Sequence, residues 1–216
     1  MYKLKGDYDK ALEYYNKSLA IRLNALGENH PDVADSYNNI GMVYHAKGDY
    51  DKSLEYFATM LSTKLYTMGE NHPDVVISYN NIGTVYKARG DYVKALEYYT
   101  KSLSIELNTF GQNHPDVATS FNNIAFVYKA KGDYNEALEY FTKSLSVKLI
   151  TLGVDHPEVA NAYSKICKVY MAMGGVERAM EYQFYSMNRA IGSLESRIGS
   201  DSGTDDSDSD TNSDTT

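Results

Sequence analysis

The sequence predicts an all-α fold in which antiparallel helix pairs stack as a solenoid. The main observation is a period of 42 residues, which relates a His-Pro-(Asp/Glu)-Val motif at His30, His72, His114 and His156 and a glycine at positions 6, 48, 90, 132 and 174. Identity between repeats is also high, because residues 28–69 and 70–111 agree at 27 of 42 positions. A fixed period with this identity indicates stacked units that each contact only their neighbours.

Each complete repeat is expected to contain two helices. In the first of them, Pro31 suits the first helical turn because its missing N–H would be unpaired there, and Asp32 complements the positive end of the helix dipole. Apolar and aromatic side chains then follow at helical spacing as far as Gly48. A second apolar face continues to about Met68, where a glycine ends the second helix.

Small residues recur where two helices are expected to approach closely. Gly41, Gly83, Ala125 and Cys167 share one position of the repeat. Cys167 is therefore interpreted as a small buried residue rather than a reactive thiol, since no base is visible beside it. As the only cysteine, it also rules out a disulfide within the chain.

The period divides the chain into six segments. These are a partial first repeat (1–27), three complete repeats (28–69, 70–111 and 112–153), a degenerate last repeat (154–195) and a Ser/Asp-rich tail (196–216). The partial repeat holds only the end of a first helix, so we expect a longer parent protein or a preceding segment that covers it. The tail cannot bury apolar surface and is expected to be disordered. Phosphorylation of Ser202, Ser207 and Thr211, which each have Asp three residues later, and a plain solubilising role both stay open.

The net charge of −8 comes mostly from the tail. Residues 201–216 contain six Asp and no basic residue, which leaves 23 acidic and 21 basic residues, or −2, for residues 1–200. A near-neutral repeat region lacks the basic surface that nucleic-acid binding requires. No run of about 18 apolar residues and no signal-peptide centre are present, which predicts a cytoplasmic protein without membrane insertion.

The repeat resembles the tetratricopeptide repeat, in which a small residue, an aromatic residue, Ile-Gly, Tyr, Gly-Asp-Tyr, Ala and a further aromatic residue stand at the same offsets. The period of 42 and the linking sequence Leu-Gly-x-x-His-Pro-Asp-Val resemble the kinesin light chain subclass. The resemblance covers residues 2 to about 191, although the last repeat is degenerate and Tyr or Phe replaces an early Trp. It implies a right-handed α-solenoid whose first helices line a groove for short peptides, with aromatic-acidic peptides accepted by the kinesin light chain type.

The candidate groove residues lie on the first helix of each repeat, at positions that the core does not use. They are the amides Asn38, Asn39, Asn80, Asn81, Asn122 and Asn123, the side chains one turn further on, Met42, Thr84 and Phe126, and the lysines Lys87, Lys129, Lys165 and Lys168. Each amide offers two donors and an acceptor to the backbone of an extended peptide. The lysines would attract acidic side chains, while Met42 and Phe126 offer apolar contact.

Two structural alternatives stand beside this interpretation. Asn39, Asn81 and Asn123 could equally bond the backbone of a neighbouring repeat. Lysines on a helix face, such as Lys87 and Lys129, often only face solvent.

Catalytic and metal chemistry are not expected. The four recurring histidines would be spaced by about a helix diameter, roughly 10 Å, whereas a shared zinc ion needs His–Zn bonds of about 2 Å. They are interpreted as residues that start helices. No phosphate-binding loop and no convergent Ser, His and Asp set is visible, so neither an enzyme nor a cofactor is predicted.

The favoured hypothesis is a protein–protein adaptor whose groove holds a short peptide, possible ligands being acidic with an aromatic anchor. The alternative is a structural spacer or a self-association module that associates through the open first repeat. A further hypothesis has the acidic tail fold over Lys165 and Lys168 and compete with the ligand, an attraction that salt would screen.

Overall fold

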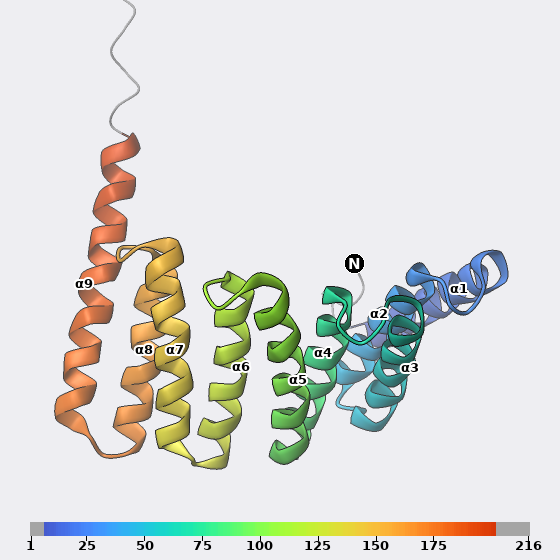
Figure 1. Ribbon diagram of the computed structural model, residues 1–216, viewed down its shortest axis with the longest axis horizontal. Helices are drawn as coiled ribbons and strands as arrows, with labels where there is room; N and C mark the ends of the chain where they lie inside the picture. The colour runs from blue at the N-terminus through green and yellow to red at the C-terminus, as the bar shows by residue number, and fades with distance from the viewer. Residues whose placement is uncertain (1–6, 202–216) are drawn as a thin grey trace, which may run out of the picture. The chain divides into compact units, whose positions relative to one another are not determined.

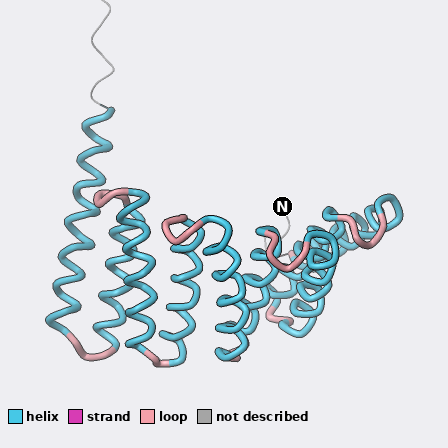
Figure 2. The backbone as a smooth tube through the Cα atoms, in the orientation of Figure 1, coloured by secondary structure: helices cyan, strands magenta, loops and turns pink. Residues whose placement is uncertain are grey.

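A computed structural model describes the backbone of residues 7–201 and the side chains as far as residue 188. This part of the chain is helical and contains no strand (Figures 1 and 2). The helices are α1 (Tyr8–Leu26), α2 (Pro31–Lys47), α3 (Tyr50–Met68), α4 (Pro73–Arg89), α5 (Tyr92–Phe110), α6 (Pro115–Lys131), α7 (Tyr134–Leu152), α8 (Pro157–Ala172) and α9 (Val176–Asp201). Short loops reverse the chain between them (Figure 2). The predicted all-α fold of stacked antiparallel helix pairs is thus confirmed.

The chain forms two compact units, residues Met1–Val147 and Lys148–Thr216. The first holds α1 to α6 and most of α7, and the second holds the end of α7 with α8 and α9. Helix α9 continues to Asp201, so the tail that was expected from residue 196 starts inside this helix. Residues 202–216, on which the predictions of disorder, phosphorylation and competition with a ligand depend, lie outside the described residues.

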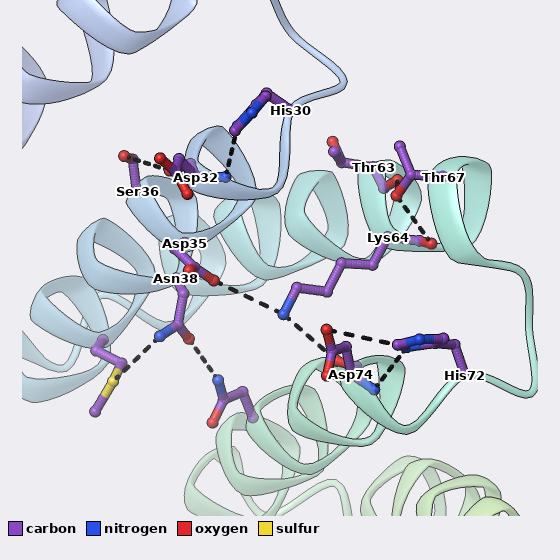
Figure 3. Close-up of polar contacts among 12 residues, drawn as sticks. His30, Asp32, Asp35, Ser36, Asn38, Thr63, Lys64, Thr67, His72 and Asp74 are labelled. Atoms are coloured by element: carbon purple, nitrogen blue, oxygen red, sulfur yellow. Dashed lines mark hydrogen bonds and ion pairs between the residues drawn. The ribbon is translucent and has the colours of Figure 1, made fainter. Parts of the chain in front are cut away.

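The recurring histidines cap the first helix of each pair. In each, the Nδ1 atom accepts a hydrogen bond from the backbone N–H two residues later, at 3.1 to 3.2 Å, as Figure 3 shows for His30 and His72. The acceptor satisfies one of the N–H groups that the first turn leaves unpaired, and proline follows directly at the next position. The interpretation of these histidines as helix-start residues is confirmed.

Glycine serves two purposes in the repeat. Gly48 and Gly90 end α2 and α4 in the left-handed conformation, with φ of 79° and 85°, where a β-carbon would be strained. Gly41 allows a close approach instead, because a Cβ there would lie 2.8 Å from the ring of Phe57. Gly83 stands in the same relation to Tyr99, at 3.0 Å, as the shared small-residue position predicted.

The core of the first unit consists of apolar clusters that each join two or three neighbouring helices. In one cluster α1 contributes Leu12 and Leu19, which pack with Val33 and Ile40 of α2. Tyrosines cover the edges of the clusters in stacked pairs, with ring centroids 5.6 Å apart in Tyr44–Tyr56, Tyr86–Tyr98 and Tyr128–Tyr140. These six tyrosines are half-buried, so the paired rings contribute apolar area to the core although their side chains carry a polar hydroxyl.

One position of the repeat carries a basic residue in three of the second helices and an acidic residue in a fourth. It holds Arg22 in α1, Lys64 in α3 and Lys148 in α7, but Glu106 in α5. Arg22 donates to the backbone oxygen of Asp32 at 2.8 Å, and Lys64 to that of Asp74 at 3.4 Å (Figure 3). These cations thus bond carbonyl groups at the start of the next helix.

Glu106 cannot donate in this way when it is ionised. Its side chain is buried, the residue being 3% exposed, and its Oε2 has no hydrogen-bond partner among the described residues. Burial raises the pKa of Glu106 to about 7, against the opposing effect of the Ser120 hydroxyl and with a further rise from Asp116. The carboxyl therefore gains or loses its proton near neutral pH.

We predict that Glu106→Gln stabilises the protein at pH 8. The folded-state pKa of about 7 lies above the ordinary 4.5, so the stability that the protonated carboxyl contributes is complete below about pH 4.5 and is lost as pH rises through 7. Replacing the ionised group should raise the free energy of unfolding at pH 8 by roughly 1–3 kcal/mol, with little effect at pH 5. Urea titrations at both pH values measure this. The exposed Glu55→Gln serves as the control, and an equal gain at both pH values for Glu106→Gln would contradict the prediction.

Candidate peptide-binding groove

The predicted groove residues of the first unit lie on α2, α4 and α6. One direct bond joins neighbouring first helices: the Nδ2 of Asn81 donates to the Oδ1 of Asn38 at 2.7 Å (Figure 3). Asn38 also places its amide nitrogen 4.0 Å from the sulfur of Met42. These two asparagines thus connect α2 to α4 through side chains, where a bond to the neighbouring backbone was the alternative expected for Asn81.

The other amides differ in their surroundings. Asn39 and Asn123 are half-buried, and the side-chain oxygen of Asn80 is buried with no donor among the described residues. Asn80 also uses its backbone oxygen to accept from the Thr84 hydroxyl at 2.8 Å. Asn80 thus has a polar atom whose hydrogen-bonding capacity the described chain does not use.

Asn122 has a packing role. The residue is 7% exposed, and its Nδ2 donates to the Ser144 hydroxyl at 2.6 Å and to the Ala118 backbone oxygen at 3.0 Å. The Ser144 hydroxyl in turn donates to the Ala118 oxygen at 2.8 Å, which joins α6 to α7. This placement does not support a ligand contact by Asn122, although its sequence position is the same as that of Asn38 and Asn80. Ser144 separates Asn122 from Asn38, whose repeat has Met60 at that position, but not from Asn80, because Ser102 of α5 stands there with no hydrogen-bond partner among the described residues.

The positions one turn beyond the amides form a partly apolar row. Met42 is 39% exposed and Phe126 is 36% exposed, with the Phe126 ring edge-on to Phe141 at a centroid distance of 5.1 Å. Between them in the repeat order, Thr84 shares a hydrogen bond of 2.8 Å with the Tyr99 hydroxyl. The Thr84 hydroxyl is therefore engaged in hydrogen bonds within the fold, whereas Met42 and Phe126 offer apolar surface.

Lys87 occupies an unusual environment for a lysine. It is half-buried, and its Nζ lies 5.9 Å from the centroid of the Phe126 ring, a cation–π arrangement that joins α4 to α6. Burial lowers the pKa of Lys87. Within the described part of the chain no carboxylate pairs with Lys87, nor with Lys129 one repeat further on. The two ammonium groups are thus available to an anion from another molecule.

The second unit holds the remaining two predicted lysines, both on α8. Burial lowers the pKa of Lys165, and Lys148 adds to this effect while Glu158 opposes it. Lys168 is exposed. In the same unit Cys167 is 7% exposed and its sulfur donates to the Oε1 of Gln183 at 3.5 Å, which confirms the buried-residue interpretation. Gln183 thus makes a polar contact at a repeat position where the other second helices have an aromatic residue.

Among residues 7–188, whose side chains the structure describes, no group of three or more His, Cys, Asp or Glu side chains is arranged to hold a metal ion. None of the helices in this range is both long and apolar enough to span a bilayer.

Comparison with known proteins identifies the family. A family model described as tetratricopeptide repeat matches residues 1–64, 62–108, 74–150 and 116–183, and together these ranges span most of the chain. The chain belongs to the tetratricopeptide repeat family. Proteins with this fold generally act as protein–protein interaction scaffolds, and no catalytic family is indicated. No curated protein sequence matches the chain.

Solved structures share the fold. A candidate kinesin light chain from Podosopora anserina with nearly identical TPR-like repeats has a TM-score of 0.76 and 23% identity, covering 87% of this chain and 89% of that one. BtubC (BKLC) from P. vanneervenii has a TM-score of 0.76 and 20% identity, covering 100% and 82%. MamA is less similar, with a TM-score of 0.60 and 18% identity, covering 92% and 95%. At these identities the likeness establishes the fold alone.

We predict that Asn122→Ala destabilises the fold by about 1–3 kcal/mol, because the substitution removes the donor to the buried Ser144 hydroxyl and one of the two side-chain donors to the Ala118 carbonyl. The neighbouring Asn123→Ala should change stability by less than about 0.5 kcal/mol, since its side chain is only half-buried. Thermal unfolding of both variants measures the difference. Equal melting temperatures would show that the α6–α7 bonds of Asn122 contribute nothing to stability.

Proposed function

We propose that the α2, α4 and α6 face binds an extended acidic peptide with an aromatic anchor, and that the protein is a cytoplasmic adaptor. The observation that carries the proposal is Lys87, a half-buried ammonium group above the Phe126 ring with no carboxylate beside it. Holding a lysine in this position costs desolvation, which a ligand carboxylate would offset. A charge-assisted hydrogen bond to such a partner is stronger than one between neutral groups.

Each part of the face has a role in this proposal. The ligand's acidic side chains pair with Lys87 and Lys129, and its aromatic anchor packs on Phe126. The amides of Asn39, Asn80 and Asn123 bond the peptide backbone. Asn38 and Asn81 are already joined to each other at 2.7 Å and act by positioning α2 against α4.

The second unit contributes separately. Lys165 and Lys168 are proposed to attract acidic side chains of the same class of ligand. The affinity should be modest, on the order of micromolar, because ordering a flexible peptide offsets much of the contact energy.

We predict that Lys87→Met weakens binding of a fluorescent peptide with one Trp between Asp and Glu residues by about 10-fold, or about 1.4 kcal/mol. Lys94→Met removes the same charge from an exposed lysine on α5 and should leave the affinity within about 2-fold. Fluorescence anisotropy measures both, at low and at physiological salt. Raising the salt should weaken binding to the parent protein more than to Lys87→Met. Equal losses for the two variants would show that only net charge matters and would refute a role for Lys87.

Self-association is the second candidate function, because helices in both units expose large apolar side chains. In α1, Ile21 is 69% and Leu26 44% exposed, and in α9 Met180 is 67% and Phe184 62% exposed. Light scattering at several concentrations should then show dimers, which Ile21→Ser or Met180→Ser would reduce. A monomer at all concentrations up to about 100 µM would exclude any self-association with a dissociation constant tighter than roughly that concentration.

A further inference from the structure

A cavity of about 470 Å³ opens in the first unit beside α2, α3 and the loop that joins α1 to α2. Glu28 of the loop, Tyr37 of α2 and Thr59, Thr63 and Tyr66 of α3 line it. None of these residues belongs to the groove described above. The lining combines one carboxylate, two aromatic rings and several hydroxyl groups.

The equivalent position to Thr59 is a lysine in three other helices, where it forms a recurring three-part arrangement. Lys17, Lys101 and Lys143 pair with the glutamate one turn earlier, at 2.6, 2.8 and 2.6 Å respectively. Each ammonium group also lies over the tyrosine next to that glutamate, 5.7, 5.3 and 4.7 Å from the ring centroid. A carboxylate and an aromatic ring on one helix thus hold a cation supplied by the same helix.

Helix α3 retains two of these three parts. Glu55 and Tyr56 stand at the positions of the glutamate and the tyrosine, but Thr59 replaces the lysine. The Thr59 hydroxyl is turned back to its own helix, where it donates to the Glu55 backbone oxygen at 3.0 Å. Among the described residues no cation pairs with the carboxylate of Glu55 or with that of Glu28. The helix therefore has the groups that hold a cation in its sibling helices, without the cation.

The next repeat indicates which space the absent lysine would fill. There Tyr79 is the counterpart of Tyr37, and Glu70 is the counterpart of Glu28. Burial raises the pKa of Tyr79, Glu70 adds to the rise and Lys101 opposes it. Both the acid and the lysine therefore lie close to this ring. The cavity beside Tyr37 and Glu28 is the corresponding space with the lysine side chain removed.

Two other substitutions adapt the cavity to a polar guest. Thr63 brings a hydroxyl where α5 and α7 have Ile105 and Val147. Tyr66, 77% exposed, adds a second ring to that of Tyr37, at a position where α5 has Asn108. The departures from the repeat thus enlarge the aromatic surface and increase the number of acceptors at the same place.

We propose that this cavity binds a single lysine or arginine side chain of a partner protein. The guest's cationic head lies beside the carboxylate of Glu28 and the rings of Tyr37 and Tyr66, while its methylene stem covers the ring surface. The site selects a basic residue, whereas the groove is proposed to select acidic ones. It does not depend on the proposed function of the groove.

The test uses the full chain, labelled with ¹⁵N, and three blocked tripeptides: acetyl-Gly-Lys-Gly-amide, acetyl-Gly-Arg-Gly-amide and the neutral acetyl-Gly-norleucine-Gly-amide. Millimolar additions of the lysine and arginine peptides should shift the backbone amide signals of residues 28–29 and 59–66, and the norleucine peptide should not. The affinity is expected in the millimolar range, because single exposed cation–π and ion-pair contacts are individually weak. Comparing the lysine and arginine peptides decides which head group the site prefers.

Two lysine substitutions distinguish the effect of filling the cavity from the effect of an added positive charge. Thr59→Lys supplies the internal cation, and its fold is secured by the native lysine at this position in α1, α5 and α7. It should weaken binding of both cationic peptides at least 10-fold, while Ala58→Lys, which adds the same charge at the neighbouring exposed position, should change it less than 2-fold. Three results would overturn the proposal: equal shifts with the norleucine peptide, full binding to Thr59→Lys, or equal losses in both variants.

Discussion

The close packing of the first helices α2, α4 and α6 between second helices is the contact on which the first unit depends. A single helix pair cannot bury its apolar face alone, so stability comes from repeating this contact along the chain. Gly41 and Gly83 set the distance of approach, because a Cβ there would meet the rings of Phe57 and Tyr99 at 2.8 and 3.0 Å. Caps by histidine and aspartate then fix where α1 to α6 and α8 begin, which keeps the 42-residue register constant.

Positions at which one repeat differs in sequence from the others account for the most unusual polar and charged environments in the structure. Glu106 replaces a cation that bonds the start of the next helix, and so introduces a carboxyl with a pKa of about 7 into the core. Thr59 replaces a lysine that its siblings hold between a glutamate and a tyrosine, and a cavity appears beside it. In both cases one substitution leaves the surrounding partners in place, because the neighbouring repeats impose the backbone geometry. A repeat array can in this way acquire local chemistry without changing its fold.

The candidate groove residues also differ between repeats, although their positions in the repeat are equivalent. Asn38, Asn80 and Asn122 are equivalent in sequence, yet Asn38 bonds the next first helix and Asn122 bonds α7 inside the core. The facing second helix has Met60 in the first case and Ser144 in the second, but Ser102 of α5, at the same position, has no hydrogen-bond partner among the described residues, so the residue type there does not by itself decide the outcome. Lys87 likewise gains its character from Phe126, 39 positions later. Position within the repeat therefore predicted which helix carries each residue and on which face of that helix it lies. It did not predict which side chain each residue contacts.

The amino-acid sequence by itself determined the helices, their ends, the small residues at close contacts and the capping histidines. These features depend on local propensity and on a period that repeats, so they can be read from one chain. Only the tertiary structure decided that Asn122 is buried, that Lys87 lies over Phe126, that α9 continues to Asp201 and that a cavity opens beside Thr59. Most of these depend on which side chains from different helices meet, and a pattern within one helix does not specify its neighbour's rotation or the volume left between them.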